Sequence, residues 1–72
     1  MNESIPLITA GDSFLIELEV YERHVQILSV QRFENNLNSE ASSERFRDLD
    51  PETKRAVIAQ VNRRHPTKMV RT

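Results

Sequence analysis

Residues 13–33 read SFLIELEVYERHVQILSVQRF, and this stretch decides the fold. In its first half Phe14, Ile16, Leu18 and Val20 alternate with a second set of side chains, a period of two that predicts a strand with one committed face. Strand-forming residues resume after Glu22-Arg23. The pattern predicts a β-hairpin with strands at about 13–21 and 24–33.

The register of this hairpin stays open at this point. A two-residue turn at Glu22-Arg23 places Val20 opposite Val25, but the apolar phase then slips after Ile27. A β-bulge there absorbs one residue and brings Val30 onto the core face. A regular ladder instead leaves a partly apolar second face made of Leu15, Tyr21, Leu28 and Val30.

A third strand and a turn precede the hairpin. Residues 4–9 are predicted to form an edge strand, because Pro6 cannot donate a hydrogen bond to a sheet ladder. Gly11 is the only glycine in the chain. It is expected to adopt positive φ in the turn that follows this strand.

Two helices are expected after the hairpin. Asp50 suits an N-cap, Pro51 the first helical position and Glu52 the positive end of the helix dipole, while Pro66 ends the helix, so a helix is predicted at 51–64. Its narrow apolar stripe consists of Lys54, Val57, Ile58 and Val61. A shorter helix is predicted at 41–48 from the spacing of Ala41, Arg45, Phe46 and Leu49.

These elements predict an α+β fold with a three-stranded antiparallel sheet and both helices on one face. Residues 1–65 form one small domain, and residues 66–72 form a basic, flexible tail. The 72 residues include no Cys, which excludes disulfides and thiolate metal sites. Because small cores often need a supplement, oligomerisation is expected.

No catalytic, metal or cofactor chemistry is expected. A chain with one glycine has neither a P-loop nor a dinucleotide-binding fingerprint. The acids Asp48, Asp50 and Glu52 are interpreted as a helix cap and first-turn charges, in preference to a cation site. Neither a secretory signal nor a membrane span is recognisable. We therefore expect a cytoplasmic protein with no enzymatic activity, no membrane partner and no small-molecule substrate.

Charge is distributed unevenly along the chain. Residues 53–72 contain six of the ten Lys and Arg residues and no acid, whereas all eleven Asp and Glu residues lie in residues 1–52. Such asymmetry is typical of a basic end that contacts a negative partner. The candidate residues are Arg55, Arg63, Arg64, His65, Lys68 and Arg71. The last helical turn also gives cations a local role, since they complement the helix C-terminus.

Two binding hypotheses follow. The first is a small regulatory protein that associates with itself or with an acidic protein through the second sheet face, which one narrow helix stripe cannot cover. That face is instead covered if Phe46 and Leu49 of the shorter helix lie over it. The second hypothesis is an accessory protein that binds nucleic acid through the basic residues. The acidic first 52 residues and the scarcity of aromatic side chains argue against it.

Overall fold

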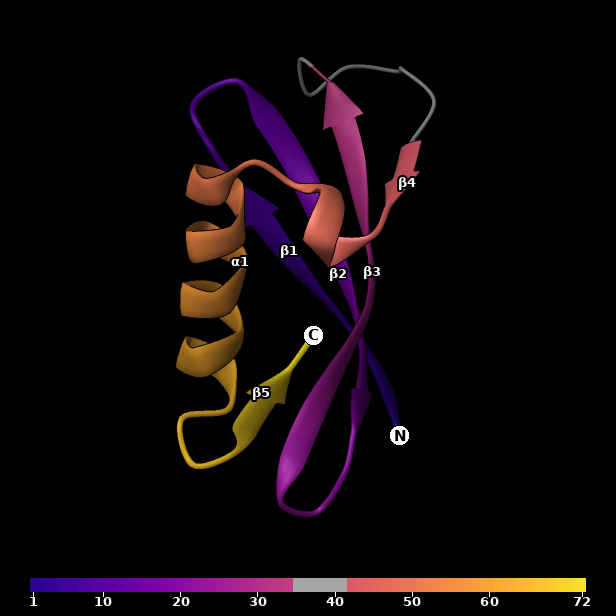
Figure 1. The fold of residues 1–72 in the computed structure, drawn as a ribbon, viewed down its shortest axis with the longest axis vertical. Coiled ribbons are helices and arrows are strands. Elements are labelled where there is room, and N and C mark those ends of the chain that lie inside the picture. Colours follow the sequence, from indigo (N-terminus) through magenta and orange to yellow (C-terminus); the bar gives the residue numbers. More distant parts are fainter. Residues whose placement is uncertain (35–41) are drawn as a thin grey trace.

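The computed structural model describes residues 1–34 and 42–72 and has an α+β fold, in which a helix packs on a curved sheet (Figure 1). The strand order is β1-β2-β3-β4, all antiparallel, and β5 pairs with β3 in parallel. The elements are β1 (Asn2–Ile8), β2 (Asp12–Val20), β3 (His24–Glu34), β4 (Ser42–Glu44), the 3₁₀ helix η1 (Phe46–Asp48), α1 (Pro51–Arg64) and β5 (Met69–Arg71). The α+β class is confirmed, but the described residues hold more strands and fewer helices than the sequence predicts.

The hairpin of β2 and β3 contains both the two-residue turn and the bulge. The Tyr21 N–H donates to the His24 carbonyl at 2.9 Å, and Val20 pairs with Val25. The register then shifts, because Leu18 pairs with Ile27 whereas Glu17 pairs with Ser29, so Leu28 has no cross-strand partner. The bulge brings Val30 opposite Ile16, where both side chains are fully buried.

Strand β1 pairs along its whole length with β2. The turn between them is closed by the Thr9 N–H, which donates to the Asp12 carbonyl at 2.9 Å. Gly11 does not have the positive φ that the sequence predicts, and a Cβ atom there would meet no heavy atom within 4 Å. The turn therefore does not depend on glycine.

The helix predicted at 41–48 is not formed. Residue 41 lies outside the described residues, Ser42–Glu44 is the edge strand β4, and a single 3₁₀ turn follows at Phe46–Asp48. Serine has a modest helix propensity, and the periodicity of this segment is weak. An ion pair of 3.1 Å between Arg32 Nε and Glu44 Oε2 ties β4 to β3. The contact with β3, which is distant in the sequence, therefore overrides the weak helix preference of this segment.

Helix α1 has the predicted bounds of 51–64. Asp50 is extended and caps it, Pro51 is its first residue, and the His65 N–H donates to the Val61 carbonyl at its end. The stripe faces the sheet, with Val57 and Val61 buried. Lys54 Nζ lies 5.9 Å from the centre of the Phe46 ring, within reach of a cation–π contact.

The C-terminal segment, predicted as a flexible tail, contains a strand. Residues Met69–Arg71 pair in parallel with His24–Gln26, and the Met69 N–H donates to the Arg23 carbonyl at 3.1 Å. Val70 packs against the core. The edge of β3 offers free backbone groups at this end, and β5 satisfies them.

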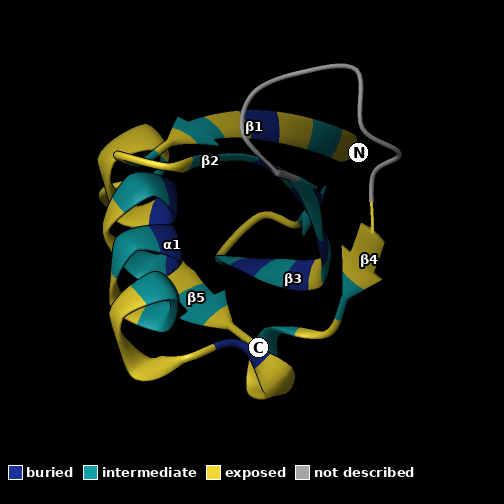
Figure 2. Cartoon of the chain, turned by 90° about the horizontal axis from the view of Figure 1, so that it is seen from above, coloured by how far each residue is buried: buried dark blue, intermediate teal, exposed yellow. Residues whose placement is uncertain are grey.

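The core lies between α1 and the inner face of the sheet, where the buried residues turn toward one another (Figure 2). Leu49 is buried there and Phe46 packs against it, so both join the inner core and leave the opposite, outer face of the sheet uncovered by η1. The buried apolar side chains are Ile5, Phe14, Ile16, Leu18, Val25, Ile27, Val30, Leu49, Val57 and Val61.

Candidate interaction surfaces

Three of the predicted basic residues contact other parts of the same chain. His65 Nε2 lies 2.7 Å from Glu3 Oε1, and Arg64 Nε lies 3.8 Å from the same oxygen. Lys68 Nζ donates to the Tyr21 carbonyl. These contacts hold the end of α1 against β1 and the following turn against the hairpin. They give three of the candidate charges a structural role.

The other three candidates lie apart from one another. Arg55 Nε donates to the Pro51 carbonyl at 3.4 Å, within its own helix. Arg63 lies about 80° around the same helix, since successive residues differ by about 100°. Arg71 is an exposed residue of β5. Arg55 and Arg63 therefore do not lie on one stripe of α1, and Arg71 belongs to a different element.

The acids around the start of α1 form a helix cap, as the sequence predicts. Asp50 Oδ2 accepts the Thr53 N–H at 3.3 Å, and the Thr53 hydroxyl donates to Oδ1. The hydroxyl bond, followed by the backbone bond from Thr53, lowers the pKa of Asp50 from its ordinary value. Within residues 1–34 and 42–72, no three His, Asp or Glu side chains are grouped to hold a metal ion.

The four residues predicted for the second sheet face occupy three different environments. Val30 is fully buried in the core, because the bulge turns it inward, so it does not belong to an exposed face. Leu28 is 52% exposed at the bulge, and Tyr21 is 47% exposed at the hairpin end, where its ring stacks on His24 with centroids 4.5 Å apart. Leu15 alone lies half-buried in the middle of the outer face.

An outer apolar patch surrounds Leu15. The ladder places Pro6 beside Leu15, and Ile8 beside Ser13, which in turn pairs with Phe33. Ile8 is 75% exposed. Sequence reasoning missed it, although the pairing of Ile5 with the buried Ile16 determines which side of β1 faces outward. The outer apolar patch consists of Pro6, Ile8, Leu15 and Phe33.

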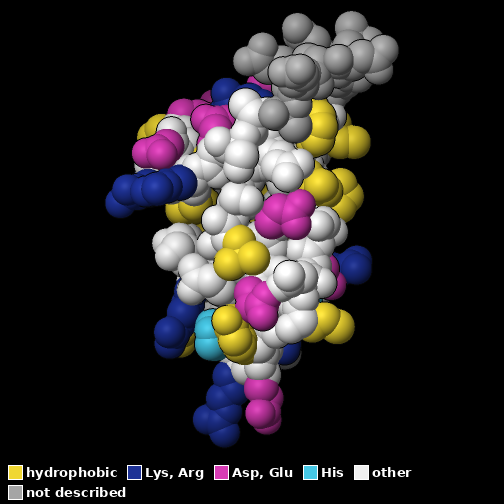
Figure 3. All heavy atoms as spheres, turned by 90° about the vertical axis from the view of Figure 1, so that its right-hand side faces the viewer, with side chains coloured by type: hydrophobic (Ala, Val, Ile, Leu, Met, Phe, Trp, Pro, Cys, Tyr) yellow, Lys and Arg dark blue, Asp and Glu magenta, His cyan; other side chains and the backbone are white. Residues whose placement is uncertain are grey.

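The other half of the outer face is polar. The Ser4 hydroxyl donates to Glu17 Oε2 at 2.8 Å, and the N-terminal ammonium lies 3.8 Å from Glu19 Oε1. Viewed from the side of β4, acidic side chains occupy the middle of the molecule, and Lys and Arg side chains lie mainly along its margins (Figure 3). The face therefore changes from apolar to acidic along the strands.

Comparison of the chain with protein-family models, with curated proteins and with solved structures finds no match. Among the described residues, no helix has the length and apolar character needed to cross a membrane.

Proposed function

We propose that this is a non-catalytic binding protein that acts by associating with protein through its outer apolar patch. The observation that carries the proposal is the 75% exposure of Ile8 beside the half-buried Leu15 and Phe33. Removing apolar surface from water is favourable by roughly 25 cal/mol per Å². A cluster of such side chains on a face that α1 does not cover is typical of an interface.

A second copy of the chain is the partner that the charge distribution favours. Glu17 and Glu19 lie on the half of the outer face that leads toward the hairpin turn, away from Ile8. A two-fold axis that lies in the plane of the contact and runs perpendicular to the strands therefore sends the acidic halves of two copies in opposite directions. Such an isologous contact buries the apolar side chains without bringing the carboxylates together.

The test is sedimentation of the protein over a wide concentration range, with one matched pair of variants. Ile8→Asp places a charge in the patch, whereas Leu28→Asp places the same charge on an exposed residue outside it. We expect the wild type and Leu28→Asp to associate and Ile8→Asp to remain monomeric. The proposal is contradicted if the wild type stays monomeric at the highest concentration, or if both variants lose self-association equally.

Nucleic-acid binding is the alternative, and it has less support. Arg64 and His65 face Glu3, and Lys68 is bound to the hairpin backbone. With only Arg55, Arg63 and Arg71 available, log K would fall with log salt at a slope of about −3. Anisotropy titrations of duplex and single-stranded probes at low salt test this directly.

A further inference from the structure

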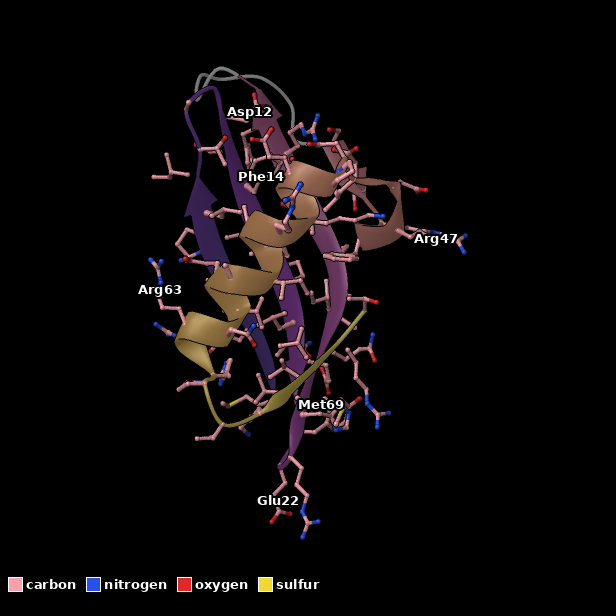
Figure 4. The ribbon with its side chains drawn as sticks, turned by 60° about the vertical axis from the view of Figure 1, so that its left-hand side comes forward. Asp12, Phe14, Glu22, Arg47, Arg63 and Met69 are labelled. Atoms are coloured by element: carbon pink, nitrogen blue, oxygen red, sulfur yellow. The ribbon has the colours of Figure 1, made fainter. Side chains whose placement is uncertain are left out.

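A groove follows the seam between α1 and the free edge of β1, the side of the molecule that Figure 4 brings forward. Three adjoining hollows of about 380, 430 and 300 Å³ run from the first turn of the helix to its last. The first two share Ala56, and the last two share Pro6, Gln60 and Arg63. Ala56 and Ala59 have short side chains, which leaves the seam open.

The β1 wall of the groove offers backbone hydrogen-bonding groups. The Val20 N–H donates to the Met1 carbonyl, and the Thr9 N–H donates to the Asp12 carbonyl. The backbone N–H and carbonyl groups of the odd-numbered residues of this segment therefore point toward β2. By the alternation of antiparallel ladders, the groups of even-numbered residues point away from β2, toward the groove. Pro6 has no N–H, and its carbonyl accepts from Gln60 Nε2 at 3.2 Å. Ile8 therefore presents an N–H and a carbonyl for which the described residues supply no partner.

The two ends of the groove carry opposite charges. Asp12 and Glu52 line the hollow at the start of α1, and Arg63 lines both hollows toward its end. Figure 4 shows Asp12 near the top of this side of the molecule and Arg63 lower down, beside α1. Arg63 is exposed and has no ion pair with any residue in 1–34 or 42–72. Its guanidinium is the group in the groove most available to a ligand anion.

We propose that this groove binds an extended segment of a partner protein that carries a carboxylate at its Arg63 end and no acidic side chain at the end beside Asp12 and Glu52. The backbone of the segment pairs with Ile8, as in the addition of a strand to a sheet edge, and its carboxylate contacts Arg63. Apolar side chains of the segment lie over Ala56 and Ala59. A nucleic acid is the weaker occupant, because Asp12 and Glu52 repel a continuous polyanion in the same groove.

The test uses a defined probe with one acidic residue, acetyl-Val-Glu-Val-Thr-Val-Thr-Val-amide, titrated into ¹⁵N-labelled protein. Its controls are the same peptide with Lys in place of Glu, the peptide N-methylated at alternate residues, and a ten-nucleotide oligo-dT. We expect the acidic peptide alone to shift the amide resonances of residues 5–8 and 56–64. Arg63→Glu should weaken its binding about 5- to 10-fold. The matched Arg55→Glu changes a helix residue that lines none of the three hollows, and should weaken binding less than twofold.

Several results would overturn the proposal. The first is an absence of resonance shifts at millimolar peptide, and the second is an equal loss of peptide affinity in Arg63→Glu and Arg55→Glu. The others are an N-methylated peptide that binds as tightly as the unmethylated one, and oligo-dT that causes the same shifts as the peptide. Shifts confined to Leu15 and Phe33 would place the peptide on the outer apolar patch instead. Sedimentation of Ile8→Asp and Leu28→Asp reports on self-association, so failure of either proposal is seen separately from the other.

Discussion

The bulge at Leu28 makes a sharp prediction about two neighbouring apolar residues. Val30→Ala removes two carbons from a fully buried side chain. At about 0.8 kcal/mol per buried methylene, the transfer loss is about 1.6 kcal/mol, and the cavity raises the expected cost to roughly 2–3 kcal/mol. This is a large fraction of the roughly 4–11 kcal/mol that a chain of this length commonly has.

Leu28→Ala is the matched control, because Leu28 is 52% exposed and has no cross-strand partner. Its expected cost is below about 1 kcal/mol. Urea denaturation followed by circular dichroism measures both variants, and the slope of unfolding free energy against urea should not change. In a ladder without the bulge, Leu28 and Val30 share the outer face. Equal costs for the two variants would therefore refute the bulge and the burial of Val30 together.

Three further predictions concern the contacts of Glu3, the cap of α1 and strand β5. Glu3→Gln removes the carboxylate that faces Arg64 and His65, and should lower the unfolding free energy at pH 7 by less than about 1 kcal/mol. The loss should be smaller in 1 M NaCl, and Glu22→Gln at the exposed hairpin turn is the control. Asp50→Ala should lower the urea midpoint above about pH 4 and have less effect at pH 2.5. The pKa of Asp50 is lower in the folded state than in the unfolded state, so its carboxylate stabilises the fold above the unfolded-state pKa. This stability is lost as the pH falls through the folded-state pKa. Removal of residues 69–72 takes Val70 from the core and should cost about 2 kcal/mol, so an unchanged melting temperature would contradict the pairing of β5 with β3.

The hairpin and α1 were predictable because their signals are local. Alternation over Phe14–Val20 and the cap sequence Asp50-Pro51-Glu52 each specify an element without reference to the rest of the chain. The bulge was one of two open alternatives, since choosing it depends on the partner strand. Strands β4 and β5 have three residues each, and both form on the exposed edge of β3. Segments this short carry little preference of their own, and only the edge determines their conformation.

The contacts of the basic residues could not be predicted from local sequence signals either. Cations near the end of α1 were predictable as helix-end charges, but the contact of His65 with Glu3 joins residues 62 positions apart. No spacing rule in the sequence pairs them. Ile8 was missed for a related reason, since an edge strand interrupted by Pro6 has no clear alternation. Its outward orientation follows only from the register with β2.

The sheet protects its two edges differently, and this restricts how the protein can associate. At one edge β4 and β5 pair with much of β3. At the other edge, which is β1, Pro6 lacks an N–H and its carbonyl accepts a hydrogen bond from Gln60. Pairing of whole strands between copies is therefore disfavoured, as in other proteins that block their edges. Ile8 differs, because its backbone borders the groove while its side chain belongs to the outer apolar patch. Under both proposals Ile8 is the point where the two surfaces meet, so a partner strand in the groove would extend the outer face beside the patch and change the surface that a second copy contacts.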